Sequence, residues 1–116
     1  MEAKAIAKSI SMSPRKVRLV VDQIRGRSVN DAYAILQYSK QAAADPVSKT
    51  LRSAVANAQY RAQEEGDVLD VDTLQVKEAF VDEGATLRRW RAAAQGRAMP
   101  IRKRTSHITV IVDTKE

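Results

Sequence analysis

The sequence GATLRRWRAAAQGRAMPIRKRTSH, residues 84–107, is the most unusual segment of this 116-residue chain. It has no Asp or Glu and carries seven cationic side chains: Arg88, Arg89, Arg91, Arg97, Arg102, Lys103 and Arg104. The whole chain has 20 basic and 14 acidic residues, so the rest holds 13 basic against 14 acidic residues. The excess charge is therefore concentrated here. Such a cationic segment favours a polyanionic partner, either nucleic acid or an anionic membrane surface.

Strand-like alternation flanks this segment on both sides. After Thr73, the pattern places Leu74, Val76, Glu78 and Phe80 on one face and Gln75, Lys77, Ala79 and Val81 on the other. Near the end, Ile108, Val110 and Val112 alternate with Thr109, Ile111 and Asp113. Two such runs favour an antiparallel hairpin. Its continuation through residues 84–91 and 97–107 predicts an arm about 25–35 Å long, at roughly 3.3 Å per residue, with a tip near residues 92–96.

The remaining chain supplies one more strand and the helices. Residues 2–10 alternate polar with small or apolar side chains, which predicts an edge strand with Ala3, Ala5, Ala7 and Ser9 on one face and Lys4, Ile6, Lys8 and Ile10 on the other. Ser13 as a cap and Pro14 in first position predict a helix that ends at Gly26.

Two further helices follow. Ser28 and Asp31 have the spacing of a capping box for a short helix that runs to about Tyr38. The main helix can begin after Ser39, with Pro46 as a kink, or at Asp45 with Pro46 in first position; we favour a short turn and the second start. Its apolar stripe is dominated by alanine, and Gly66 ends it. The stripe consists of Leu51, Ala54, Val55, Ala58 and Ala62.

These elements predict an α+β fold. We expect about three helices packed on a three-stranded antiparallel sheet, with a long protruding β-hairpin arm. A chain of this length is expected to form a single domain over residues 1–116, with residues 84–107 as the arm.

Composition limits the kinds of function. The chain has no Cys and one His, so neither thiolate chemistry nor a histidine-rich metal site is expected, and we predict no cofactor. No run of 18 apolar residues occurs and the start lacks a long apolar segment, so we expect a soluble intracellular protein without a membrane partner.

The simplest alternative for the cationic segment is a solvated, disordered loop without a specific partner. The strand pattern on both sides and Trp90 among the arginines favour an ordered arm, although an isolated two-stranded ribbon is marginal in water and needs an external partner. Trp90 can stack on an exposed base or anchor the arm to its own body. Thr105 and Ser106 can continue the strand, bond phosphates, or do both.

Other candidate contacts lie outside the run of cations. His107 has no partner ligand, which favours a hydrogen-bonding strand residue over a catalyst. Arg15, Lys16 and Arg18 near the positive start of the first helix can form a second nucleic-acid surface, or they can simply be a solvated helix face.

Catalysis finds little support in the sequence. The acidic residues Asp67, Asp70, Asp72 and Glu78 do not match a calcium loop, whose third and fifth positions would be Leu69 and Val71. No phosphate-binding glycine motif occurs. We therefore expect no enzyme. The alternative from another class is a DNA-architectural protein with basic β-arms, in which Met99 or Pro100 would be the wedge.

Four segments together resemble a known family. They are SPRKVRLVVDQIRGRSVNDAYAIL (13–36), SAVANAQ (53–59), VDEGATLRRWR (81–91) and GRAMPIRKRTSHITVIV (96–112). They closely resemble ribosomal large-subunit protein twenty-two in its bacterial form, over nearly the whole chain. The resemblance implies a compact α/β body and a long β-hairpin embedded in large-subunit ribosomal RNA of the 23S type, which aids subunit assembly and whose tip lines the nascent-peptide exit tunnel.

The resemblance also implies a location, partners and contact residues. It implies a monomer within the large ribosomal subunit of the cytoplasm, beside other large-subunit proteins and the nascent polypeptide. The RNA-binding residues implied or proposed are Arg15, Lys16, Arg18, Arg88, Arg89, Trp90, Arg91, Arg97, Arg102, Lys103, Arg104, Thr105, Ser106 and His107. The tunnel tip would be Ala92, Ala93, Ala94, Gln95 and Gly96. This tip departs from a common family pattern, RPRARGRA, in lacking two arginines and a proline.

Overall fold

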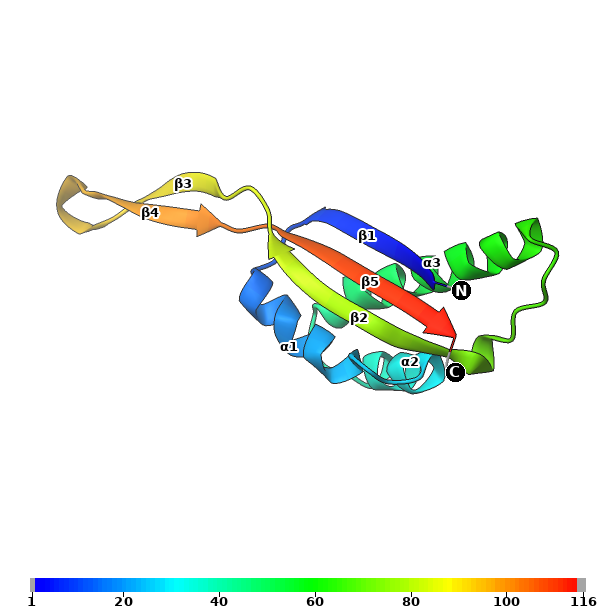
Figure 1. The fold of residues 1–116 in the computed structure, drawn as a ribbon. Helices are drawn as coiled ribbons and strands as arrows, with labels where there is room; N and C mark the ends of the chain where they lie inside the picture. The colour runs from blue at the N-terminus through cyan, green and yellow to red at the C-terminus, as the bar shows by residue number, and fades with distance from the viewer. Residues whose placement is uncertain (1, 115–116) are drawn as a thin grey trace.

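The chain folds into two layers, a three-stranded sheet and a layer of helices, from which a two-stranded arm projects (Figure 1). The computed structural model describes residues 2–114. In chain order the elements are β1 (Glu2–Ile10), α1 (Pro14–Ile24), α2 (Val29–Gln37), α3 (Ala44–Glu64), the 3-10 turn η1 (Val71–Thr73), β2 (Leu74–Glu83), β3 (Leu87–Ala92), the 3-10 turn η2 (Ala94–Gly96), β4 (Ala98–Lys103) and β5 (Ser106–Thr114). The described structure extends over 67 × 27 × 17 Å, and the arm lies at one end of the long axis.

The sheet has the predicted strands and pairing. Its order is β1-β5-β2, both pairings are antiparallel, and β1 is an edge strand as expected. The helices cover one face, with α1 packed on β2 and α3 packed on β1 and β5. The predicted α+β fold with three helices is therefore confirmed. Because alanines line the buried side of α3, this helix can lie close to the sheet, and Ala54 and Ala58 have no exposed surface.

Two β-bulges change which side chains face the core. In β2, Val76 is opposite Val112 but Glu78 is opposite Ile111, so Lys77 is an extra residue. A bulge places two consecutive residues on the same side, and both Lys77 and Glu78 are exposed. The strict alternation predicted for β2 is therefore wrong after Val76.

The bulge in β2 determines which residues of its second half are buried. Ala79 and Val81 face the helices, and Phe80 is 40% exposed on the opposite face. Lys77, turned to the outer face, pairs with Glu2 on β1 at 3.1 Å between Nζ and Oε2. This hydrogen bond and charge raise the pKa of Lys77.

The bulge in β1 has a similar effect near the arm. Ala7 is opposite Ile108 and Ile10 is opposite Ser106, so Lys8 and Ser9 together oppose His107. Ser9 has φ 58°, an unusual conformation for a residue with a side chain. Ile10 consequently packs against the core, so its predicted place on the same face as Lys4 and Ile6 is wrong.

The helix ends agree with the sequence in position and differ in detail. Ser28 Oγ accepts the Asp31 amide at 3.2 Å, as the capping box predicts. Ser13 occupies the expected cap of α1, but its side chain makes no capping bond; its backbone carbonyl accepts the amides of Lys16 and Val17 instead. The main helix is capped by Ala43, so the predicted cap at Asp45 is wrong by two residues, and Asp45 and Pro46 lie within its first turn.

The arm is a separate two-stranded sheet and is not a direct continuation of β2 and β5. We define the arm as residues 87–103, and the neck as residues 84–86 and 104–105, which have no strand structure. The prediction of continuous strands through residues 84–91 and 97–107 is therefore corrected. In the neck, the Thr105 hydroxyl donates to the Ala85 carbonyl at 2.6 Å, and the Gly84 amide donates to the Thr105 carbonyl at 3.0 Å.

The core is apolar and lies between the sheet and the helices. Its largest fully buried side chains are Ile24, Leu51, Leu74 and Ile108. No described helix combines the length and the apolar character needed to cross a membrane.

Candidate nucleic-acid interface

Cations occupy both faces of the arm. Residues directly opposite each other in an antiparallel pair share a face. One face carries the pairs Arg88–Arg102, Trp90–Pro100 and Ala92–Ala98, and the other carries Leu87–Lys103, Arg89–Ile101 and Arg91–Met99. A ribbon that is positive on both faces can meet phosphates on two sides at once. It is therefore suited to insertion between RNA segments, and not only to lying on one surface.

No protein group neutralises these cations in the described structure. All residues of β3 are exposed, and β4 is exposed apart from a half-buried Ile101. None of the arm's cations has an ion-pair partner within residues 2–114. Arg88 and Arg102 even lie directly opposite each other, a like-charge pair that destabilises a ribbon. The arm thus lacks the burial and the charge compensation that a self-supporting hairpin would need.

Trp90 is part of the exposed arm and does not anchor it to the body. Its side chain is 68% exposed, and it lies in β3 opposite Pro100. Figure 1 shows β3 projecting away from the helices and the three-stranded sheet. Of the two sequence-based alternatives, anchoring is therefore wrong, and the indole face is accessible for stacking on a base.

The turn at the end of the arm is short, and Arg97 is its one charged residue. The last paired residues are Ala92 and Ala98, so the turn comprises residues 93–97, one residue further along than predicted. The Ala93 amide donates to the Arg97 carbonyl at 2.7 Å, which closes the turn. Gln95 and Gly96 have φ of 63° and 72°, the left-handed conformation that such a closure requires.

Sequence reasoning did not identify the neck, which fixes the arm to the body. A Cβ at Gly84 would lie 2.4 Å from Thr105 Oγ1 and 3.1 Å from the His107 ring, so only glycine fits between them. His107 Nδ1 accepts the Ser9 amide at 2.9 Å, which supports its interpretation as a hydrogen-bonding strand residue. The only sequence signal was a glycine immediately after a strand.

Ser106 has a structural role at the base of the neck. It has no exposed surface, and its hydroxyl donates to the Met12 carbonyl at 2.6 Å. This geometry corrects the expectation that its side chain contacts RNA. Thr105 and His107 are also committed to bonds within the protein, although both retain some exposed surface.

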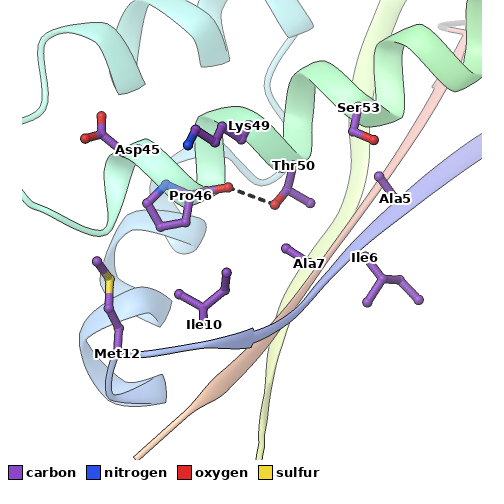
Figure 2. A pocket seen from close by; sticks show the side chains of 10 residues that line it. All are labelled: Ala5, Ile6, Ala7, Ile10, Met12, Asp45, Pro46, Lys49, Thr50 and Ser53. Atoms are coloured by element: carbon purple, nitrogen blue, oxygen red, sulfur yellow. Dashed lines mark hydrogen bonds between the residues drawn. The ribbon is translucent and has the colours of Figure 1, made fainter.

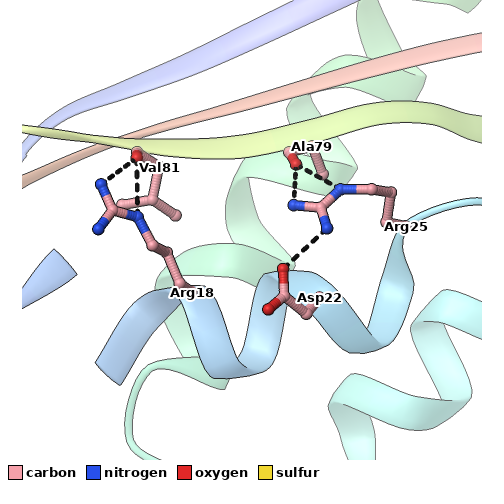
Figure 3. A network of polar contacts seen from close by, with 5 residues as sticks. All are labelled: Arg18, Asp22, Arg25, Ala79 and Val81. Atoms are coloured by element: carbon pink, nitrogen blue, oxygen red, sulfur yellow. Dashed lines mark hydrogen bonds and ion pairs between the residues drawn. The ribbon is translucent and has the colours of Figure 1, made fainter. Parts of the chain in front are cut away.

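The three cations of α1 separate into two groups. Arg15 and Lys16 are exposed in the first turn, where helix dipole and side-chain charge both favour an anion. Arg18 instead reaches β2, where its Nε and Nη2 donate to the Val81 carbonyl at 3.2 and 2.9 Å (Figure 3). Its guanidinium is therefore used to close the outer edge of β2, which makes it a weaker candidate for RNA contact than its neighbours.

Arg25, which sequence reasoning did not identify as functional, also donates to a backbone carbonyl of β2. Its Nε and Nη2 donate to the Ala79 carbonyl at 3.0 and 2.7 Å, and its Nη1 pairs with Asp22 at 2.8 Å (Figure 3). Arg18 and Arg25 thus join α1 to alternate carbonyls of one strand.

Substitution distinguishes the roles of the α1 cations. We expect Arg18→Ala to lower the free energy of unfolding by about 1 kcal/mol, because charge-assisted hydrogen bonds are lost but solvent screens the exposed side chain. Lys16→Ala removes the same charge without removing a bond to β2, and we expect it to leave stability nearly unchanged. Urea denaturation of the two variants measures both effects; equal stability would contradict the edge-closing role of Arg18.

The acidic residues before β2 stabilise local structure. Asp70 Oδ1 accepts the Asp72 amide at 3.0 Å and caps the 3-10 turn η1. Asp72 Oδ1 accepts from Asn30 Nδ2 at 2.7 Å, which ties this turn to α2. These bonds give Asp70 and Asp72 structural roles.

The comparisons with known proteins agree with this geometry. A family model described as Ribosomal protein L22p/L17e matches residues 5–113. The chain belongs to this family. It is 55% identical to Large ribosomal subunit protein uL22 of Bifidobacterium longum over 116 residues, which cover 100% of this chain and 98% of the relative.

Two further relatives extend the match to other bacteria. The chain is 54% identical to uL22 of Oceanobacillus iheyensis over 116 residues, which cover 100% of this chain and 98% of that protein. It is 56% identical to uL22 of Desulfitobacterium hafniense over 115 residues, which cover 99% and 96%. The family and these names are those of ribosomal proteins and not of enzymes, so the expected family is confirmed and the expectation of no catalysis is supported.

Proposed function

We propose that this chain binds large-subunit ribosomal RNA of the 23S type and that the arm supplies most of the binding. The observation that carries the proposal is the distribution of cations on both faces of the arm, in a segment, residues 84–107, that has no Asp or Glu. Each phosphate contact releases condensed counterions from RNA, which gives the exposed cations a favourable partner that the free protein lacks. The relatives are named as large ribosomal subunit proteins, which supports the same partner.

The mode of binding follows from the shape of the arm. Because both faces are cationic, the arm joins RNA segments that lie on either side of it, and this bridging aids assembly of the subunit. Arg15 and Lys16 at the start of α1 add a second contact from the body. The protein acts as a monomer within the large subunit of the cytoplasmic ribosome, beside other large-subunit proteins.

The tip has a different task from the rest of the arm. Residues 92–96 are small or neutral, in contrast to the cationic strands on either side. We propose that these residues line the exit tunnel and meet the nascent polypeptide, as the family resemblance implies. The absence of charge at the tip leaves phosphate binding to Arg88, Arg89, Arg91 and the cations of residues 97–104.

The DNA-architectural alternative loses its structural basis. Pro100 lies within β4 opposite Trp90, and Met99 lies opposite Arg91, so neither occupies the turn from which a wedge would enter a base step. Family membership also favours RNA.

The salt dependence of RNA binding tests the proposal. We expect Arg88→Ala combined with Arg89→Ala to reduce the slope of log K against log salt by about 1.4–1.8, because each phosphate contact contributes about 0.7–0.9. Thermal stability should change little, since both residues are exposed and lie outside the body. Filter binding to large-subunit RNA over a salt series measures the slope.

A control with matched charge separates specific contacts from net charge. Lys40→Ala combined with Arg52→Ala also lowers the formal charge from +6 to +4, but both residues lie on the body, outside α1 and the arm. We expect the Lys40→Ala and Arg52→Ala double variant to retain most of the salt dependence of RNA binding shown by the parent chain. Equal losses from both double variants would show that overall charge, and not the arm, determines binding.

A further inference from the structure

The outer edge of β2 is closed by bonds from the helical layer. The Gly26 amide donates to the Val76 carbonyl at 3.0 Å, and the Val76 amide donates to the Arg27 carbonyl at 2.8 Å. Further along, the carbonyls of Ala79 and Val81 accept from Arg25 and Arg18 (Figure 3). These contacts occupy acceptors that an additional strand would need.

The outer edge of β1 is closed only in its first half. Arg61 donates to the Glu2 carbonyl, and Asn57 Nδ2 donates to the Lys4 carbonyl at 3.0 Å. Because backbone groups face the same edge at every second residue, the amide and carbonyl of Ile6 and the amide of Lys8 come next. Within residues 2–114, no side chain of α3 bonds to these groups. This second half of β1 is an unpaired sheet edge.

A groove lies beside this unpaired edge. Figure 2 shows α3 on one side and β1 with the following turn on the other. The groove has a volume of about 390 Å³, and its walls include Ala7, Ile10, Met12 and Pro46. Thr50 contributes little polarity because its hydroxyl donates to the Pro46 carbonyl at 2.8 Å. The space is therefore large enough for an apolar side chain and has an apolar lining.

Charge around the groove restricts the occupant. Lys4 and Lys8 on β1 and Lys49 on α3 are exposed, and none has an ion-pair partner among the described residues. Asp45 is the only carboxylate of the groove wall. A second copy paired through β1 would bring lysines against lysines, which is unfavourable. RNA would satisfy the lysines but would not fill an apolar groove or continue a β-ladder.

We propose that the second half of β1 and the adjoining groove bind an extended acidic segment of a partner protein. The segment adds a fourth strand along Ile6 to Lys8, a known mode of peptide recognition. Alternate side chains of a strand face opposite sides, so its apolar residues enter the groove beside Ile10 while its carboxylates lie near Lys4 and Lys8 on the outer face. This site is separate from the arm and does not depend on RNA binding.

A designed peptide tests the site directly. The probe is an acetylated and amidated hexapeptide with alternating Glu and Leu, added to the ¹⁵N-labelled full chain. We expect saturable amide shifts confined to residues 5–10 and 45–53. A peptide of the same sequence, N-methylated at alternate amides so that it cannot pair, should bind at least tenfold more weakly.

Variants of the chain provide an independent check. Ile6→Pro removes an outward amide at a strand edge, where proline is tolerated, and should weaken binding of the hexapeptide at least tenfold. Ile6→Val keeps this amide and should bind the hexapeptide like the parent chain. If Ile6→Pro fails to fold by circular dichroism, the N-methylated peptide decides the question. Equal binding of both peptides, shifts centred on the arm, or no saturable shift at millimolar peptide would each overturn the proposal.

Discussion

Deleting residues 86–103 is expected to leave a folded body that is no longer retained by high-salt-washed large subunits. The core contains no residue of this segment, and the three-stranded sheet pairs without it. The deletion removes six of the seven cations of the segment 84–107 and both cationic faces. Each phosphate contact contributes about 0.7–0.9 to the slope of log K against log salt, so the deletion removes several such contributions to binding. We therefore expect retention on the subunits at moderate salt to fall by at least about 100-fold. Cosedimentation of the purified chain with washed subunits measures the loss.

The control keeps the arm and removes its charge. In this variant the same six cations, Arg88, Arg89, Arg91, Arg97, Arg102 and Lys103, are replaced by Gln. We expect it to lose retention nearly as completely as the deletion, because the arm has few other groups with which to hold RNA. Undiminished retention of the deleted chain would mean that the body supplies the binding and that the arm is secondary.

Gly84→Val, a substitution in the neck, is expected to lower both the stability of the protein and its affinity for RNA. A Cβ at this position would approach Thr105 Oγ1 to 2.4 Å, and relieving that contact breaks the Thr105 hydrogen bond to Ala85 or displaces His107. Overpacking of this kind costs about 1–3 kcal/mol. The arm would also lose its fixed direction relative to the body. We therefore expect a lower melting temperature together with weaker RNA binding, although no cation has been removed.

Ala85→Val provides the matched control for the neck. This substitution places the same valine side chain one residue further along, at an exposed position. We expect this variant to melt and to bind RNA almost like the parent. If Gly84→Val bound RNA normally despite a lower melting temperature, the direction set by the neck would be unimportant for binding.

The sequence predicted the elements well because their signals are local. Pro14, the Ser28 cap and the glycines after α1 and α3 mark helix ends, and the apolar alternation of residues 108–112 identifies the central strand. The concentration of cations marked the segment 84–107, and the strand alternation on both sides of it predicted an arm. Such features depend on neighbouring residues, so they do not require knowledge of the tertiary structure.

The features that the sequence missed depend on distant contacts. Lys77 and Ser9 mark bulges that are determined by the register with β5, which no local pattern specifies. Ser106 looks like a polar strand residue until the Met12 carbonyl, 94 positions away, is seen to accept its hydroxyl. Arg18 likewise resembles its exposed neighbours, and only the position of β2 shows that its guanidinium is used within the protein.

Photo-crosslinking in cells tests most directly whether the arm is the RNA-binding element. A photoreactive phenylalanine analogue would replace Trp90 in the arm and, in a separate chain, the fully exposed Val68. Val68 belongs to the loop between α3 and η1. Figure 1 shows this loop at the end of the molecule opposite the arm. We predict abundant adducts with large-subunit ribosomal RNA from position 90 and few from position 68. No RNA adduct from position 90, or equal yields from both positions, would contradict the account.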